Sequence, residues 1–139
     1  MYWLYTSYSF DELKKSRKAS LKGTVAISNL TIKRAELSFI YRTKMDGFSL
    51  VYNGVGGVGP KGKGGLRERI LQELSGGHGT GSLAIWKSSR SDPNKWRYSW
   101  VTLRQGKHNA DFEEQYSQWA ETLEMAWRLE FGWPILCTK

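Results

Sequence analysis

The segment from Gly54 to Gly65 is so rich in glycine that it excludes regular secondary structure over its length. Glycine loses more conformational freedom on folding than any other residue, so a run of glycines is unfavourable in a helix or strand. The run therefore predicts a flexible loop with separate elements before and after it. The chain of 139 residues shows no internal repeat or domain linker, and we predict a single domain over residues 1–139.

Glycine loops between a strand and a helix are also typical of nucleotide-binding proteins, but two observations count against that interpretation. The chain is too short for the repeated parallel units of a dinucleotide fold, and no ribose-binding acidic residue stands in the expected context. The loop also lacks the Gly-Lys-Ser/Thr ending of a phosphate-binding P-loop. Its Gly-x-Gly-x-x-Gly spacing follows from glycine density alone.

A β-hairpin is predicted immediately before the loop. Residues 36–43 are typical of a strand, and Phe48 to Tyr52 alternate between apolar and polar positions like a second one. Asp46 and Gly47 between them provide a turn signal.

The remaining elements follow from capping signals and periodicity. Ser9 and Glu12 form a predicted capping box for a short helix that reaches about Lys18. Strands are predicted over 23–32, 83–86 and 96–103, and a helix over 66–74 that Gly76 ends.

A long amphipathic helix is predicted over 111–131, before Gly132 and Pro134. Its apolar residues recur every three or four positions and are expected to face the core: Phe112, Tyr116, Trp119, Leu123 and Trp127. The order of elements predicts an α+β domain with a small antiparallel or mixed β-sheet flanked by helices. Residues 1–35 are expected to be an N-terminal extension packed on it.

Composition narrows the function. The net charge of +8 favours a polyanionic partner, of which nucleic acid is the commonest. No stretch approaches the roughly 20 apolar residues of a membrane span, and no signal peptide is recognised, so we expect a cytoplasmic protein without a membrane partner. One cysteine excludes an internal disulfide framework, and one cysteine with two histidines cannot form a structural zinc site.

Four residues in a fixed order suggest a chemistry. Tyr41 and Tyr52 are eleven positions apart on the predicted hairpin, Arg69 lies on the helix after the glycine loop, and Glu124 lies on the last helix. This order resembles the GIY-YIG nuclease family. Residues 39–41 stand where the first motif of the family would be.

Further segments carry the resemblance. Residues 52–54 stand where the second motif would be, 66–70 look like the family's Leu-x-x-Arg-Ile segment, and 123–128 are similar to a run in its structure-specific endonucleases. Phe39 and Asn53 depart from the motifs, and Glu73 stands where one branch has histidine.

The resemblance implies a GIY-YIG-like domain that hydrolyses phosphodiester bonds of DNA with Mg²⁺ or Mn²⁺. Glu124 would hold the metal, and Arg69 would stabilise charge on the phosphate. Tyr41 would orient or deprotonate the attacking water, and Tyr52 would hold phosphate or water.

Four further residues are expected to contact nucleic acid: Lys61, Lys63, Arg67 and His78. Alternatives stay open at this point. The substrate is RNA in one of them, and in another the chain is a non-catalytic nucleic-acid-binding module of the same fold. Strand tyrosines also serve as packing residues, and Glu124 with Arg128 has the spacing of an ordinary helix ion pair. Specificity would come from loops or from a homodimer.

Overall fold

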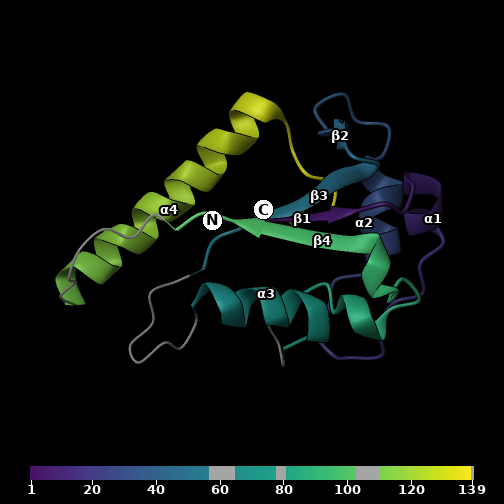
Figure 1. Ribbon diagram of the computed structural model, residues 1–139, viewed down its shortest axis with the longest axis horizontal. Coiled ribbons are helices and arrows are strands. Elements are labelled where there is room, and N and C mark those ends of the chain that lie inside the picture. Colours follow the sequence, from purple (N-terminus) through teal and green to yellow (C-terminus); the bar gives the residue numbers. More distant parts are fainter. Residues whose placement is uncertain (57–64, 78–80, 103–109, 139) are drawn as a thin grey trace.

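The computed structural model describes residues 1–56, 65–77, 81–102 and 110–138, with only the backbone described over 110–117. Its centre is a four-stranded antiparallel sheet in the order β2-β3-β1-β4. The strands are β1 (Tyr2–Thr6), β2 (Lys44–Met45), β3 (Phe48–Gly54) and β4 (Trp96–Trp100). Helices lie around this sheet (Figure 1), which confirms the predicted α+β class.

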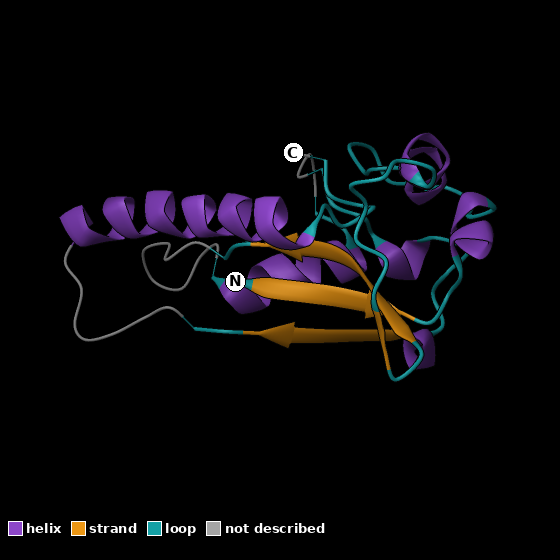
Figure 2. Cartoon of the chain, turned by 90° about the horizontal axis from the view of Figure 1, so that it is seen from above, coloured by secondary structure: helices purple, strands orange, loops and turns teal. Residues whose placement is uncertain are grey.

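The helices are α1 (Phe10–Lys14), α2 (Ile27–Arg34), α3 (Leu66–Ser75) and α4 (Ala110–Phe131). The predicted capping box is present at α1, where Ser9 and Glu12 bond each other's backbone amides. The α3 helix packs its Ile70 and Leu74 into the core. It lies along one face of the sheet, whereas α4 runs past one end of the strands and extends beyond that end (Figures 1 and 2).

The partner of β3 differs from the prediction. β3 pairs along its length with β1, whereas residues 36–43 form turns and irregular chain. Only a two-residue remnant of the expected hairpin exists, β2, closed by Asp46 and Gly47, whose φ angles are both positive. β1 is the preferred partner of β3 because its alternate side chains, Tyr2, Leu4 and Thr6, are fully buried, whereas residues 36–39 are exposed. The segment 1–35 thus contributes the strand between β3 and β4.

Two other predicted strands are wrong. Within 23–32 the chain forms α2, where the buried Thr31 hydroxyl donates to the Ile27 carbonyl one turn earlier. Within 83–86 it forms the 3₁₀ turn η2 (Ile85–Lys87), entered through Ala84 in a left-handed conformation. Both segments are short and rich in β-branched or apolar residues, and such content does not by itself distinguish a strand from a helix. The predicted strand over 96–103 is confirmed as β4 for residues 96–100.

The helix α4 is confirmed in extent, but its rotation differs from the prediction. Ala120 and Arg128 are its buried side chains among residues 118–131, whereas Trp119 and Phe131 are about half exposed. Trp127 is half-buried, and the side chains of Phe112 and Tyr116 lie outside the described residues. The face turned toward the sheet is therefore partly polar, and its polar contacts belong to the site described below.

The segment after α4 closes the core. Residues 134–137 are buried, and the amide of Leu136 donates to the carbonyl of Val51 at 2.8 Å, on the edge of β3 that β2 leaves free. Within the part of the chain that the structure describes, no helix is both long and apolar enough to cross a membrane.

Candidate functional site

A cavity of about 480 Å³ lies where the end of the sheet meets α3 and α4. Its walls come from β1, β3, α3 and α4, which are far apart in the sequence. The titratable side chains that line it are Tyr2, Tyr52, Arg69, Glu73, Glu121, Glu124 and Arg128.

Three of the four residues expected from the sequence line this cavity: Tyr52, Arg69 and Glu124. Tyr41 does not. Its ring packs on Trp127 at a centroid distance of 5.7 Å, and its amide donates to the Trp133 carbonyl. Because residues 36–43 form no strand beside β3, the eleven-residue spacing does not bring the two tyrosines together.

The remaining expected contacts are placed in part. Arg67 is exposed on the first turn of α3, two residues before Arg69. Lys61, Lys63 and His78 lie outside the described residues.

Tyr2 takes the place that the sequence assigned to Tyr41. It lies opposite Gly54 in the β1–β3 register, and its ring is 6.0 Å from that of Tyr52. The glycine is required there, because a Cβ at position 54 would lie only 2.6 Å from the Tyr2 hydroxyl oxygen. The available signal was the aromatic run of residues 2–8, which lies in the segment 1–35 that was expected to be an N-terminal extension.

Glu73 is the second residue that sequence reasoning missed as part of the site. Its carboxylate is almost completely buried, accepts the Leu83 amide at 2.9 Å, and lies 3.5 Å from the Tyr2 hydroxyl, which donates to it. The Tyr52 side chain acts on the same carboxylate and lowers its pKa. A charged residue on the apolar face of a helix was the available signal, since Glu73 follows the buried Ile70 by three positions.

Burial shapes the proton affinities of this cluster. Desolvation raises the pKa of Tyr2 and Tyr52 above the ordinary 10, and the Glu73 charge raises both further. Desolvation also raises the pKa of Glu73, although its bond from the Leu83 amide works in the opposite direction. The two phenols therefore stay protonated at neutral pH, and Glu73 is the group of the cluster that can take up a proton.

Arg69 reaches the cavity from the first half of α3 and is only half-buried. Its guanidinium donates to the Gln72 side chain at 2.9 Å. Its positive charge partly opposes the rise in the pKa of Tyr2 and of Glu73, so Arg69 acts on the same buried cluster.

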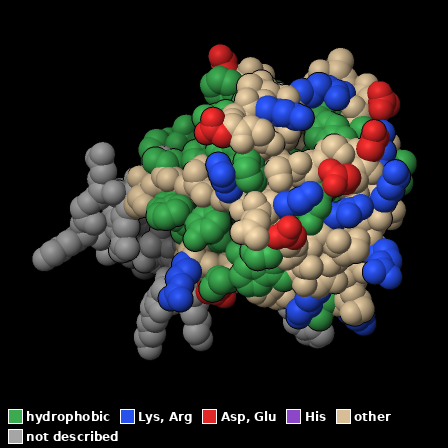
Figure 3. Space-filling view, turned by 45° about the vertical axis from the view of Figure 1, so that its right-hand side comes forward, with side chains coloured by type: hydrophobic (Ala, Val, Ile, Leu, Met, Phe, Trp, Pro, Cys, Tyr) green, Lys and Arg blue, Asp and Glu red, His purple; other side chains and the backbone are tan. Residues whose placement is uncertain are grey.

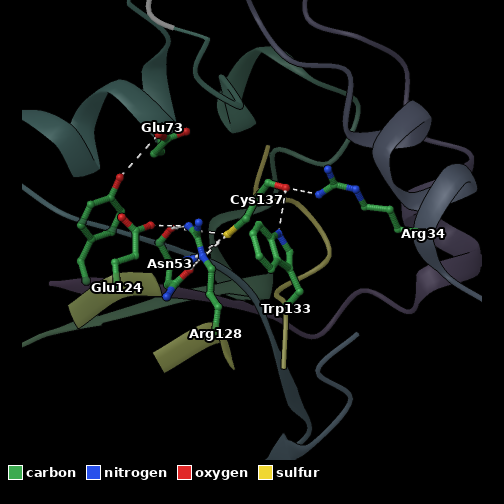
Figure 4. A network of polar contacts seen from close by, with 8 residues as sticks. Arg34, Asn53, Glu73, Glu124, Arg128, Trp133 and Cys137 are labelled. Atoms are coloured by element: carbon green, nitrogen blue, oxygen red, sulfur yellow. Dashed lines mark hydrogen bonds and ion pairs between the residues drawn. The ribbon is translucent and has the colours of Figure 1, made fainter. Parts of the chain in front are cut away.

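Glu124 is held by an ion pair with Arg128 one turn further along α4. Arg128 is buried, and its Nε donates to Asn53 Oδ1 at 2.9 Å. A second guanidinium nitrogen donates to the Asn53 carbonyl, so the network in Figure 4 fastens α4 to β3. Burial raises the pKa of Glu124, and the Arg128 charge opposes this.

Cys137 completes the network on the far side of Asn53. Its thiol donates to Asn53 Oδ1 at 3.2 Å, and burial raises the pKa of this thiol to about 12 (Figure 4). The thiol is thus protonated and inert at neutral pH. The Arg128 guanidinium also lies 4.9 Å from the centroid of the Trp133 ring.

The donor set of the cavity fits a weakly held hard cation. No group of three or more His, Cys, Asp or Glu side chains is arranged as a metal cage among the residues described. Mg²⁺, however, is commonly bound through one or two carboxylates together with waters and substrate phosphates. Glu124, with Glu121 one turn away on the same wall, supplies oxygens of that kind.

The burial of Glu73 predicts a pH dependence of stability. Its folded pKa is raised, so its contribution to stability is full below the ordinary pKa of 4.5 and is lost as pH rises through the folded value. We expect Glu73→Gln, which cannot ionise, to gain stability relative to the wild type as pH rises through that window. Urea denaturation of both proteins over a pH series measures this difference, and a difference independent of pH would contradict the assignment.

Comparisons of the chain with protein-family models, with curated proteins and with solved structures gave no match.

Proposed function

We propose that the protein is a divalent-metal-dependent endonuclease that hydrolyses phosphodiester bonds of DNA, similar to the GIY-YIG nucleases. The observation that supports this most is the convergence of Tyr52, Arg69 and Glu124 on one cavity, from three elements far apart in the chain. The sequence order alone had suggested these three residues. The net charge of +8 adds support for a polyanionic substrate.

Each side chain has a role in this proposal. The Arg69 guanidinium binds non-bridging phosphate oxygens and stabilises the charge that develops on them. Glu124 holds Mg²⁺ or Mn²⁺, which would polarise the phosphate and acidify a bound water. Lys61, Lys63, Arg67 and His78 stay proposed contacts to the nucleic acid, and a cytoplasmic location and a homodimer stay part of the proposal.

We assign the proton path in this proposal to the buried cluster of Tyr2, Tyr52 and Glu73. The raised pKa values of Tyr2 and Tyr52 mean that neither phenol acts as a base unaided. The Tyr2 hydroxyl donates to Glu73, so Tyr2, on receiving the proton of an attacking water, passes its own proton to Glu73. Tyr2, in this scheme, takes the role that the sequence gave to Tyr41.

Plasmid cleavage in Mg²⁺ and Mn²⁺ tests the proposal. Wild type is expected to nick supercoiled DNA, and Glu124→Gln to bind DNA with unchanged affinity but to cleave at least about 100-fold more slowly. Glutamine keeps a hydrogen-bond acceptor for Arg128, so the variant is expected to fold. Glu130→Gln, an exposed change on the same helix, is the matched control and should cleave normally.

Two other outcomes decide between the alternatives. Wild type that binds DNA but cleaves neither DNA nor RNA with any divalent ion would be a non-catalytic binding module. Cleavage confined to RNA would identify a ribonuclease that uses the same residues.

A further inference from the structure

The edge strand β4 presents two large aromatic side chains to solvent. Tyr98 and Trp100 are 51% and 56% exposed, and their rings stack with centroids 5.7 Å apart and planes inclined by 26°. Val101 beside them is 43% exposed. An exposed pair of this kind loses the benefit of burial, so a contact with a partner is the usual reason for it.

The register of the sheet places this pair beside the candidate site. Trp100 lies opposite Tyr2, and Tyr98 lies opposite Leu4, in the β1–β4 pairing. Directly paired residues project from the same face of a sheet, so the stacked rings share the face of Tyr2, a wall of the cavity. β4 is the edge strand remote from α4, as Figure 2 shows, and the rings therefore lie at the edge of the sheet, one strand away from Tyr2.

Charge indicates the class of partner. The chain carries an excess of eight positive charges, and Figure 3 shows lysine and arginine side chains spread over the face in view, with hydrophobic groups gathered on part of it. Flat aromatic rings on a basic protein are the combination that binds unpaired nucleobases, because every base offers a π-face to stack on. Neither the net charge nor the position next to Tyr2, which lines the cavity, favours an apolar protein partner.

We propose that Tyr98 and Trp100 form a stacking platform for an unpaired nucleobase next to the cavity. The location of the platform relative to a scissile phosphate rests on the proposed nuclease function, whereas base stacking itself does not. The consequence is a preference for nucleic acids with single-stranded or distorted regions over uninterrupted duplex.

Binding of fluorescein-labelled oligodeoxythymidine, and of a blunt duplex, measured by anisotropy in Ca²⁺ tests the platform. We expect the double variant Tyr98→Ala/Trp100→Ala to lose at least about tenfold in affinity for the single strand and to bind the duplex as wild type does. Trp100→Phe, which keeps a ring, should retain most of the affinity. The control Trp86→Ala, an exposed tryptophan on η2, should change neither affinity.

Several outcomes would overturn the platform: an unchanged affinity for the single strand, equal losses on both probes, or a wild-type dimer that the double variant converts to monomer in sedimentation. Far-UV circular dichroism checks that the variants fold. Plasmid cleavage by wild type is measured alongside. If the double variant loses single-strand binding and wild type does not cleave the plasmid, the platform is supported and the DNA nuclease is rejected. If wild type cleaves the plasmid and the double variant binds the single strand as wild type does, the nuclease is supported and the platform is rejected.

Discussion

Arg69→Ala is expected to lower the rate of DNA cleavage about 100- to 1,000-fold, the usual effect of removing one donor that stabilises developing charge. The side chain is half-buried and donates to Gln72. Without it, the buried Glu73 keeps its hydrogen bonds from the Leu83 amide and the Tyr2 hydroxyl. We therefore expect little change in the free energy of unfolding. Single-turnover cleavage of a labelled duplex, with urea denaturation in parallel, measures both quantities.

Arg67→Ala is the matched control for this prediction. The two arginines lie on the same helix two residues apart, but Arg67 is exposed and does not line the cavity. Loss of the Arg67 side chain should weaken DNA binding and reduce the salt dependence of binding. The rate at which bound DNA is cleaved should stay the same. Equal rate losses in both variants would show that Arg69 acts through general charge and not at the reacting phosphate.

Arg128→Met is expected to destabilise the protein by about 3–5 kcal/mol, the range for breaking a buried ion pair by removing one partner. The change leaves Glu124 partly buried without the guanidinium of its ion pair and removes one donor from each of two acceptor oxygens of Asn53. Methionine fills most of the volume, so the loss reports the polar contacts more than a cavity. Urea denaturation at neutral pH measures the change.

The double variant Arg128→Met/Glu124→Gln separates the two contributions. It removes the unpaired charge, so we expect it to recover part of the loss, and the remainder measures the link between α4 and Asn53. A single variant as stable as the wild type would mean that α4 does not depend on this network for its place on the sheet.

The sequence predicted the parts of this fold that depend on local interactions. The capping box at Ser9, the helix after the glycine loop and the extent of α4 all follow from contacts within a few residues. The choice of a partner for β3 depends on which distant segment buries more surface, and periodicity does not report that. Residues 36–43 alternate adequately, but β1 buries three side chains completely.

The site residues, too, were predictable where they depend on local structure and were missed where they depend on distant packing. Arg69 and Glu124 lie on helices whose positions along the chain were predictable, and the structure brings both to the cavity. Tyr41 was assigned from its spacing to Tyr52 and from the expected hairpin, so it was misplaced with that hairpin. Glu73 was noticed only as a departure from a motif. Its value lies in its burial among two phenols, which only the tertiary structure reveals.

Several contacts of this fold join segments that are far apart in the sequence. Tyr2 pairs with Trp100, and the Leu136 amide bonds to the Val51 carbonyl. Arg34 likewise bonds to the carbonyl of Cys137. Such non-local contacts slow folding, because a long loop must close before the contacts stabilise it. The cavity therefore forms only once the segment around residue 137 can pack against β3.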